Sequence, residues 1–228
     1  MSKCANCHQA GKHPFCNLGQ ESRAYFDSNS ISMGYPRGSV LFREGDRSDA
    51  VFVVCSGRVK VSATSRDGRT MILRIANAGD VLGMSAALTS GESEITAEAL
   101  EPCRVCVFHL KHLTTMLEQY SDASMVAAKV LAEDYRAAFD EARLMGLPGS
   151  PAGRVARLIL DWAADARKSS NAFITMSLTH EEVASMTATT RETVTRTLSR
   201  FRKDKIISTR GVALTVLQPR ALEQLSAC

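Results

Sequence analysis

Residues 178–203 read LTHEEVASMTATTRETVTRTLSRFRK, a run in which hydroxyl side chains precede regularly spaced apolar residues. Thr179 with Glu182, and Thr189 with Glu192, each match the capping box. In that motif a threonine and a glutamate satisfy backbone N–H groups at the start of a helix. The pattern therefore predicts two short helices joined by a tight turn, the second of which begins at Thr189.

The second predicted helix has an apolar face and a polar one. Val194, Leu198 and Phe201 share the side that packs inward. Arg191 and Glu192 lie elsewhere, in the amino-terminal half that a recognition helix inserts into the major groove. An arginine can bind guanine through two hydrogen bonds, and a glutamate can accept one from the cytosine amino group. The helix is predicted to read DNA; an exposed mixed-charge face without a ligand is the alternative.

Positive charge surrounds this helix. From Arg191 to Arg210 there are seven lysine and arginine residues and two acidic residues. A local surplus of this kind is typical of a surface that binds a polyanion, although a solvated basic face would look the same.

The flanks of this region complete a winged helix-turn-helix domain, predicted over residues 148–228. Ser150 followed by Pro151 is a favourable helix start, and apolar residues at helical spacing follow from Val155 to Ala166. The carboxyl-terminal part contains two short apolar runs, Ile206–Thr209 and Ala213–Leu217, which predict the strands of the wing.

Residues 121–147 have the period of a long helix. Apolar residues recur at alternating spacings of three and four, which is the heptad pattern of a helix that pairs with a second helix. The predicted seam consists of Ala128, Leu131, Tyr135, Ala138, Ala142 and Met145. A core-facing helix within one domain is the alternative. Gly146-Leu147-Pro148-Gly149 ends the pattern and predicts a hinge.

Residues 21–120 have the period of β-strands instead. Short apolar runs lie between turn residues, and in Arg58–Ala63 apolar and polar residues alternate, as in a half-buried strand. The other predicted strands are Ser39–Phe42, Val51–Cys55, Met71–Ala76 and Arg104–Leu110. Many short strands at regular spacing predict a small antiparallel barrel or jelly roll. The fold class is therefore α+β.

The motifs in this order resemble the Crp–Fnr family of bacterial transcription regulators. Residues 178–184 and 190–196 are similar to the family's paired DNA-binding helices. Leu41-Phe42-x-Glu44-Gly45-Asp46 and Gly79-Asp80-x-x-Gly83 are similar to its cyclic-nucleotide-binding fold. The resemblance extends from about Ile31 to the carboxyl terminus.

The resemblance implies a homodimer that binds a palindromic operator on double-stranded DNA and contacts RNA polymerase. Half-sites similar to TGTGA or TTGAT are expected. His180 stands where the family more often has arginine. The residues implied to contact DNA are Thr179, His180, Thr190, Arg191, Glu192, Thr195, Arg196 and Arg200.

The barrel departs from the cyclic-AMP-binding pattern. Met84 follows Gly83, and Ser93-Glu94-Ile95-Thr96 lies where nucleotide-binding members carry an arginine for the cyclic phosphate. A phosphate needs cations or free backbone donors around it, and Glu94 would repel it. Cyclic AMP is therefore not expected as the ligand, whereas another small ligand in the barrel stays open.

Three of the seven cysteines, Cys4, Cys7 and Cys16, lie in a polar segment, residues 1–20, without a sustained period. Clustered cysteines in a chain without a secretion signal indicate metal or redox chemistry. The oxygen-sensing branch of the Crp–Fnr family has a similar trio and one distant cysteine in the barrel, which Cys106 matches. The resemblance thus implies Cys4, Cys7, Cys16 and Cys106 as ligands of a [4Fe–4S] cluster.

Two alternatives to the cluster stay open: a zinc site, with His8 or His13 as further ligands, and thiols without a metal. Cys103 competes with Cys106 for the fourth ligand position. Residues three apart on a strand point to opposite faces, so only one of the two is expected to serve. Cys55, in an apolar run, is expected in the core.

Other function classes find no support in the sequence. It contains no Gly-rich phosphate loop with lysine, no nucleophile elbow and no HExxH motif, so an enzyme is not expected. No apolar run approaches the length of about 20 residues that spans a bilayer. A cytoplasmic protein without a membrane partner is expected.

Overall fold

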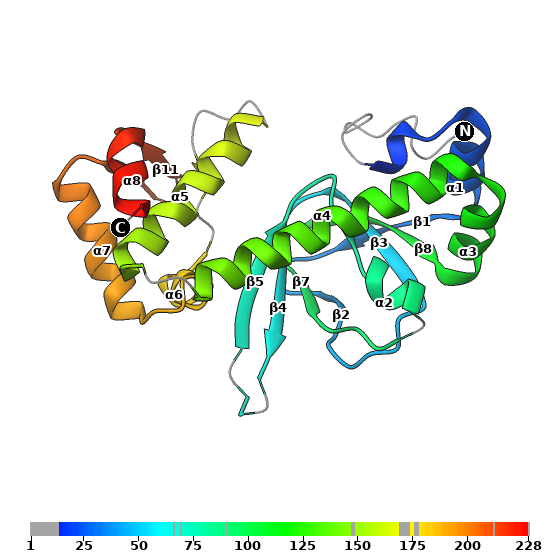
Figure 1. Ribbon diagram of the computed structural model, residues 1–228, viewed down its shortest axis with the longest axis horizontal. Coiled ribbons are helices and arrows are strands. Elements are labelled where there is room, and N and C mark those ends of the chain that lie inside the picture. Colours follow the sequence, from blue (N-terminus) through cyan, green and yellow to red (C-terminus); the bar gives the residue numbers. More distant parts are fainter. Residues whose placement is uncertain are drawn as a thin grey trace. The chain divides into compact units, whose positions relative to one another are not determined.

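A computed structural model of the 228-residue chain describes residues 14–65, 67–68, 70–89, 91–146, 149–168, 174–175, 178–211 and 213–227. The chain divides into two compact units, residues 1–139 and 140–228, each with its own packing. Mixed helices and antiparallel sheets confirm the predicted α+β class (Figure 1).

The first unit contains two four-stranded antiparallel sheets, in the orders β1-β8-β3-β6 and β2-β7-β4-β5. The five strands predicted from apolar runs are all present, with ends shifted by at most one residue. The strands are β1 (Ile31–Tyr35), β2 (Val40–Phe42), β3 (Ala50–Ser56), β4 (Val59–Thr64), β5 (Thr70–Ala76), β6 (Val81–Leu82), β7 (Thr96–Ala99) and β8 (Cys103–His109).

The alternation predicted for β4 holds only in its first half. Val59 and Val61 are buried, as expected, but beyond them Ser62 is buried and Ala63 is half-buried. The pairing of β4 with β5 shifts register between Val61 and Ser62. The extra residue at this bulge is Leu73 of β5, and an irregularity of the neighbouring strand cannot be recognised from the pattern of β4.

The first sheet has an apolar core on each face. On one face, Val54, Leu82 and Val105 pack with Val59 and other residues of the second sheet, so this core lies between the sheets. The other face is covered by helices, and its core cluster contains Phe15, Phe26, Cys55, Cys106, Phe108, Leu113 and Met116. We call this second set the helix-side core. Cys55 therefore lies in the core, as predicted.

The helices of the first unit were only partly anticipated. They are η1 (Pro14–Asn17), α1 (Gln20–Asn29), α2 (Met84–Thr89), α3 (Leu110–Gln119) and α4 (Ser121–Gly146). The periodicity of residues 121–147 predicted α4 alone. Neither Gly19 before α1 nor His109 before α3 donates a side-chain cap, so the sequence carries no start motif there.

The second unit has the predicted three helices and two wing strands in the predicted order, together with β9 and α8, which were not predicted. Its elements are α5 (Pro151–Lys168), β9 (Ile174–Thr175), α6 (His180–Met186), α7 (Arg191–Lys203), β10 (Ile207–Arg210), β11 (Ala213–Val216) and α8 (Pro219–Ser226). The sheet order is β10-β11-β9. The Ser150 hydroxyl accepts from Gly153 N at 3.0 Å, which confirms the predicted start of α5.

One capping box is confirmed and the other is wrong. Thr179 and Glu182 cap α6 reciprocally. For α7, however, Thr190 is the cap, and its hydroxyl accepts from Thr193 N at 3.3 Å. The helix therefore begins at Arg191, not at Thr189. Thr189 N donates instead to the carbonyl of Ala184 at 3.0 Å, so the preceding turn uses this residue.

Close packing of α5 on α8 predicts a cost for any side chain at Gly153. A Cβ atom there would lie 2.7 Å from the carbonyl oxygen of Leu225, closer than real Cβ contacts. Gly153→Ala is expected to lower the free energy of unfolding by about 1–2 kcal/mol, because the clash outweighs the helix propensity gained. Trp162, the single tryptophan, lies in α5 and reports unfolding by fluorescence in urea.

Gly149 supplies the matched control, since a Cβ there meets nothing within 4 Å. Gly149→Ala should leave the urea midpoint nearly unchanged. Equal midpoints for Gly153→Ala and the unsubstituted protein would contradict the packing described.

Candidate nucleic-acid interface and cysteine site

The turn between α6 and α7 is held by one arginine of α5. Arg154 donates from Nε to the carbonyl of Thr187 at 2.7 Å and from Nη2 to that of Ala188 at 3.1 Å. Ala188 has φ of 45°, a conformation that costs energy for a residue with a Cβ. The arginine thus satisfies the carbonyl groups of a strained turn and fixes the angle at which α7 leaves it. Arg154 was not predicted from the sequence, because no motif distinguishes it from a surface cation.

The two faces of α7 are separated as predicted. Val194, Thr197, Leu198 and Phe201 are buried. The polar side chains on the other side are exposed to solvent, and with them the capping Thr190. The exposed set is Thr190, Arg191, Glu192, Thr195, Arg196, Ser199 and Arg200. The amino-terminal half of α7 therefore presents two guanidinium groups and a carboxylate from a rigid, packed helix.

A hydrogen bond joins the two helices at this surface. His180 Nδ1, from the first residue of α6, lies 2.8 Å from Thr195 Oγ1. The Thr195 hydroxyl also donates to the carbonyl of Arg191 at 2.9 Å. A hydroxyl has one proton to donate, so His180 donates from Nδ1 to Thr195 when the bond to Arg191 is made. His180 thus orients the threonine, and its Nε2 stays available for another contact.

The predicted seam residues lie on α4 in two environments. Ala128, Tyr135 and Ala138 are exposed, whereas Leu131 is half-buried and packs against the helix-side core. The backbone of Ala142 and Met145 lies within α4, but their side chains are outside the described residues. The described part of the seam is thus available to a partner except at Leu131.

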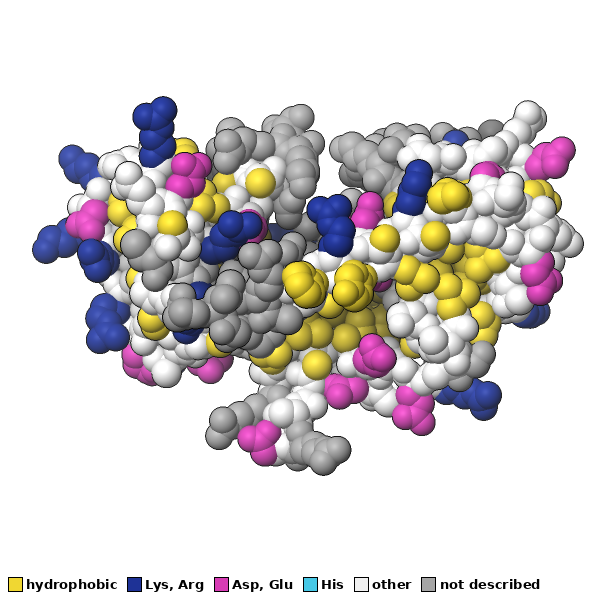
Figure 2. Space-filling model, viewed as in Figure 1, with side chains coloured by type: hydrophobic (Ala, Val, Ile, Leu, Met, Phe, Trp, Pro, Cys, Tyr) yellow, Lys and Arg dark blue, Asp and Glu magenta, His cyan; other side chains and the backbone are white. Residues whose placement is uncertain are grey.

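The apolar surface of α4 extends beyond that seam. Met125 and Phe139 are 59% and 55% exposed, and Tyr135 is 71% exposed. The rings of Tyr135 and Phe139 stack at 6.4 Å. Figure 2 shows hydrophobic side chains at the surface along this helix. Met125, Ala132 and Phe139 are seven residues apart and form a second row beside Ala128 and Tyr135; spacing alone could have identified them.

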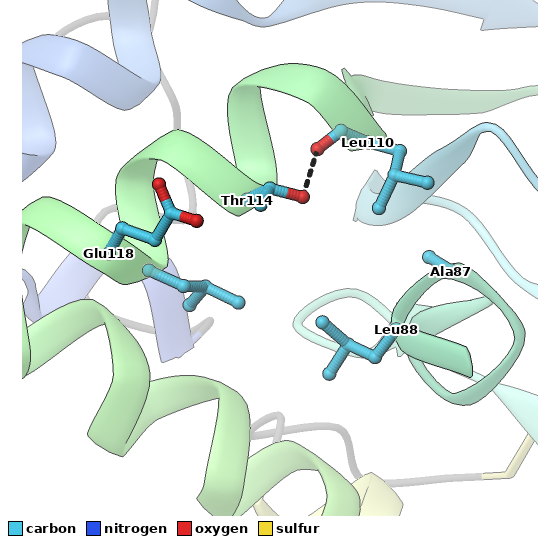
Figure 3. Close-up of a pocket in the computed structure, with 6 residues that line it drawn as sticks. Ala87, Leu88, Leu110, Thr114 and Glu118 are labelled. Atoms are coloured by element: carbon cyan, nitrogen blue, oxygen red, sulfur yellow. Dashed lines mark hydrogen bonds between the residues drawn. The ribbon is translucent and has the colours of Figure 1, made fainter. Parts of the chain in front are cut away.

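A surface cavity of about 380 Å³ opens between α2 and α3 (Figure 3). Ala87, Leu88 and Leu110 contribute apolar surface to it, and Glu118 is the charged side chain among its lining residues. This lining offers a carboxylate and no cation to a ligand. It therefore does not resemble a site for a cyclic phosphate.

The cysteines predicted to bind metal are only partly visible. Cys4 and Cys7 lie outside the described residues. Cys16 is buried in η1, and its neighbours Phe15 and Leu18 belong to the helix-side core together with Cys106. In the described parts of the chain, no three histidine, cysteine or acidic side chains form a group that could hold a metal ion.

Cys103 and Cys106 point to opposite faces of β8, as predicted. Cys103 packs in the core between the sheets, whereas Cys106 packs in the helix-side core. The Cys103 Sγ donates to the carbonyl oxygens of Arg58 or Glu101, at 3.3 and 3.1 Å. Burial raises the pKa of the Cys103 thiol, which disfavours its thiolate form.

Two polar links join α4 to the rest of its unit. Asp122, in the first turn of α4, accepts from Ser22 Oγ at 2.6 Å and from Gly19 N at 2.7 Å. These hydrogen bonds lower the pKa of the Asp122 carboxyl. Further along α4, Asp134 pairs with Arg74 of β5 at 3.0 Å; burial raises the pKa of Asp134, and the arginine opposes this shift.

Known proteins with both halves of this architecture identify the family. Residues 33–120 match the cyclic nucleotide-binding domain, and residues 153–225 match the Crp-like helix-turn-helix domain. The transcriptional activator protein Anr of Pseudomonas protegens is 26% identical over 225 residues, which cover 94% of this chain and 90% of Anr. The chain belongs to the Crp–Fnr family.

Other Crp–Fnr proteins share the fold at similar identity. The CRP-like cAMP-activated global transcriptional regulator of Mycobacterium tuberculosis is 27% identical over 169 residues, which cover 73% of this chain and 75% of that protein. The structure of FixK2 from Bradyrhizobium japonicum superposes with a TM-score of 0.78 at 22% identity, covering 87% of this chain and 98% of FixK2. Crp–Fnr proteins are transcription regulators that bind DNA and act as dimers; they are not enzymes.

Most of the predicted DNA-contacting side chains are exposed on α7 or at its cap, and His180 of α6 is hydrogen-bonded to one of them. The Thr179 hydroxyl already accepts a hydrogen bond as the cap of α6, and Arg200 lies 3.6 Å from Asp204 at an exposed position.

Within the described ranges, every helix is too short or too polar to span a lipid bilayer.

Proposed function

We propose that this Crp–Fnr regulator acts as a homodimer whose α7 helices read a palindromic operator with half-sites similar to TGTGA or TTGAT, and that it contacts RNA polymerase there. The observation that carries the proposal is α7 itself. Its apolar residues are buried, while Arg191, Glu192 and Arg196 are exposed side by side in its amino-terminal half. Two such helices related by a two-fold axis match a two-fold symmetric site.

The residues at this surface are of two types, those suited to contact bases and those suited to contact phosphates. Arg191 and Arg196 can bind guanine O6 and N7, and Glu192 can accept from a cytosine amino group. Thr190 and Arg200 flank them and suit contacts to phosphate oxygens, which position the helix without reading the bases.

Binding to short labelled duplexes tests the proposal. The full-length protein is titrated, by fluorescence anisotropy at fixed salt, into a duplex with two TTGAT or TGTGA half-sites whose centres are about 10 base pairs apart. A scrambled duplex of equal composition is the control. At least a thousandfold tighter binding to one palindrome is expected. Equal affinity for the palindromes and the scrambled duplex would contradict specific recognition of these half-sites.

His180 is expected to act on DNA through Thr195. Because His180 Nδ1 orients the threonine hydroxyl, His180→Ala and Thr195→Val should weaken operator binding and change preference at the same base pair. Their effects should be non-additive, with a coupling free energy of about 0.5–3 kcal/mol in a double-mutant cycle.

Operator variants substituted at each half-site position give the measurement. If His180 only contacts a phosphate, His180→Ala should weaken binding to all sequences equally and add to the effect of Thr195→Val. That pattern would contradict the positioning role.

We further propose that the arm, residues 1–20, and the barrel bind a [4Fe–4S] cluster through Cys4, Cys7, Cys16 and Cys106; zinc on the same thiolates is the alternative. Iron–sulfur clusters are held by cysteine thiolates, and zinc also binds thiolate sulfur. Support comes from Cys106, which faces the helix-side core into which Phe15 and Leu18 fold on either side of Cys16. Bound, such a cluster supplies sensitivity to oxidants.

The coupling to DNA binding would run through α4. Asp122 ties the start of α4 to Gly19 and Ser22, directly after the segment that contains Cys16. A change in the arm would thus reach the helix proposed to set the spacing of the two DNA-binding units. For the cluster to act as a switch, it must bind one dimer arrangement better than the other. A ligand inside the barrel has less support, because the buried residues that pack between the two sheets form an apolar core.

Cys106→Ser is expected to remove most of the iron and sulfide from protein purified without oxygen, together with its visible absorption. Cys103→Ser is the matched control, because Cys103 points to the other face of β8. It should leave iron content near that of the unsubstituted protein. Zinc in place of iron in the unsubstituted protein would overturn the cluster, and iron loss only in Cys103→Ser would overturn the ligand assignment.

A further inference from the structure

Cys55 and Cys106 form a pair of thiols within the barrel. Cys55 lies on β3 and Cys106 on the neighbouring strand β8, and their Sγ atoms are 3.3 Å apart. Both are at least nine-tenths buried and belong to the helix-side core. The proposed cluster ligands include Cys106 but leave its neighbour Cys55 without a role.

We propose that Cys55 and Cys106 form an intramolecular disulfide when the protein meets a peroxide, and that this bond removes Cys106 from the available metal ligands. The first part rests on the described strands alone. The second part rests on the proposed role of Cys106 in metal binding.

The reaction balances with peroxide as the oxidant. One sulfur attacks a peroxide oxygen, the O–O bond breaks, and with H₂O₂ the products are a sulfenic acid and water. The second sulfur then attacks the sulfenic sulfur; the S–S bond forms and the S–O bond breaks, releasing another water. Two thiols and one hydrogen peroxide thus give one disulfide and two waters, with two electrons passing from sulfur to peroxide.

The local backbone suits closure of this bond. A disulfide requires an S–S distance of about 2.05 Å, so the two sulfurs must approach by about 1.2 Å. Cys106 lies opposite Val53, and the pairing of β3 with β8 shifts register between Val54 and Ser56, at Cys55 itself. Because the ladder is irregular at a bulge, Cys55 can adjust with little disturbance of the paired residues around it.

Cys103 cannot take the place of Cys106 in this bond. It points into the core between the sheets, so β8 itself separates its sulfur from that of Cys55. The proposed pairing is therefore specific within the barrel.

Tryptic digestion distinguishes the cysteines concerned. Cleavage after arginine and lysine places Cys55 in residues 48–58 (SDAVFVVCSGR) and Cys106 in residues 105–111 (VCVFHLK). Cys103 lies in a different tryptic peptide, because Arg104 separates it from Cys106. Full-length metal-free protein is treated with equimolar hydrogen peroxide, blocked with N-ethylmaleimide, digested and analysed by mass spectrometry. A linked pair 48–58 and 105–111 that separates on reduction is expected, also in Cys103→Ala.

Linkage of Cys106 to Cys4, Cys7 or Cys16, or alkylation of Cys106 as a thiol after peroxide treatment, would overturn the proposed disulfide.

A second measurement tests the effect of the disulfide on metal binding. Peroxide treatment should reduce subsequent iron and sulfide uptake severalfold in the unsubstituted protein until reductant is added, and much less in Cys55→Ala. Equal loss in both proteins would overturn the competition for Cys106. If untreated protein takes up no iron, the cluster proposal and this competition fail, while the peptide result still decides the disulfide.

Discussion

Arg191→Ala is expected to weaken binding to the palindromic operator by at least about 30-fold, because the dimer loses two bidentate arginine–guanine contacts, each of which contributes about 1–3 kcal/mol of discrimination. Arg191 is the first residue of α7, and its side chain is exposed. Its removal should therefore leave the fold and the thermal midpoint unchanged. The loss should be concentrated at one base pair of each half-site: operators already substituted there should bind the variant and the unsubstituted protein alike.

Two substitutions serve as comparisons for Arg191→Ala. Arg200→Ala, at a proposed phosphate contact, should weaken binding to all sequences evenly and reduce the salt dependence by about one ion per half-site. Arg220→Ala, at an exposed position of α8, should do neither. A uniform loss in Arg191→Ala, without a change in base preference, would show that Arg191 contacts the backbone and that another residue reads the base.

The sequence predicted the DNA-binding half well because its information is local. The capping box at Thr179, the apolar spacing of α7 and the proline after Ser150 each act within one or two helical turns. The predicted cap of α7 was wrong by one residue, because Thr189 and Thr190 are chemically equivalent caps. Which of the two threonines caps α7 depends on the strained turn at Ala188, whose carbonyl accepts a hydrogen bond from Arg154 of α5. A tertiary contact of that kind cannot be recognised from the periodicity of the sequence.

The cysteine site illustrates a different limit. Strand alternation was enough to place Cys103 and Cys106 on opposite faces and Cys55 in the core. The proximity of Cys55 to Cys106 was not predictable, because it depends on which strands pair and on the register shift beside Cys55. The coupling of Asp122 to Gly19 and Ser22 spans about a hundred residues of sequence and was likewise missed.

The largest effect on function is expected from a substitution in the exposed apolar surface of α4. Tyr135 is 71% exposed and Phe139 is 55% exposed, although both are aromatic. Residues of this size at heptad spacing are typical of a helix that packs against a second copy. Dimer formation also joins two DNA-binding units, so that the second half-site is bound at a high effective concentration, which commonly raises affinity by 10²–10⁴-fold.

Tyr135→Asp is therefore expected to give a folded monomer with at least 100-fold weaker operator binding. Two carboxylates facing each other in an apolar seam would be desolvated without a partner, whereas in the monomer the new side chain is in water. Analytical ultracentrifugation should show a mass near 24.7 kDa, and half-site duplexes should bind the variant and the unsubstituted protein with comparable affinity.

Lys129→Asp is the matched control, since Lys129 is exposed on α4 about 120° around the helix from Tyr135. It places the same aspartate side chain on α4, with a charge change of two units instead of one, and should keep both the dimer and the operator affinity. A dimer that survives Tyr135→Asp but is lost in Lys129→Asp would move the interface to another face of α4. Loss of neither would mean that this helix does not hold the two subunits together, and the exposed aromatic row would then need a different partner.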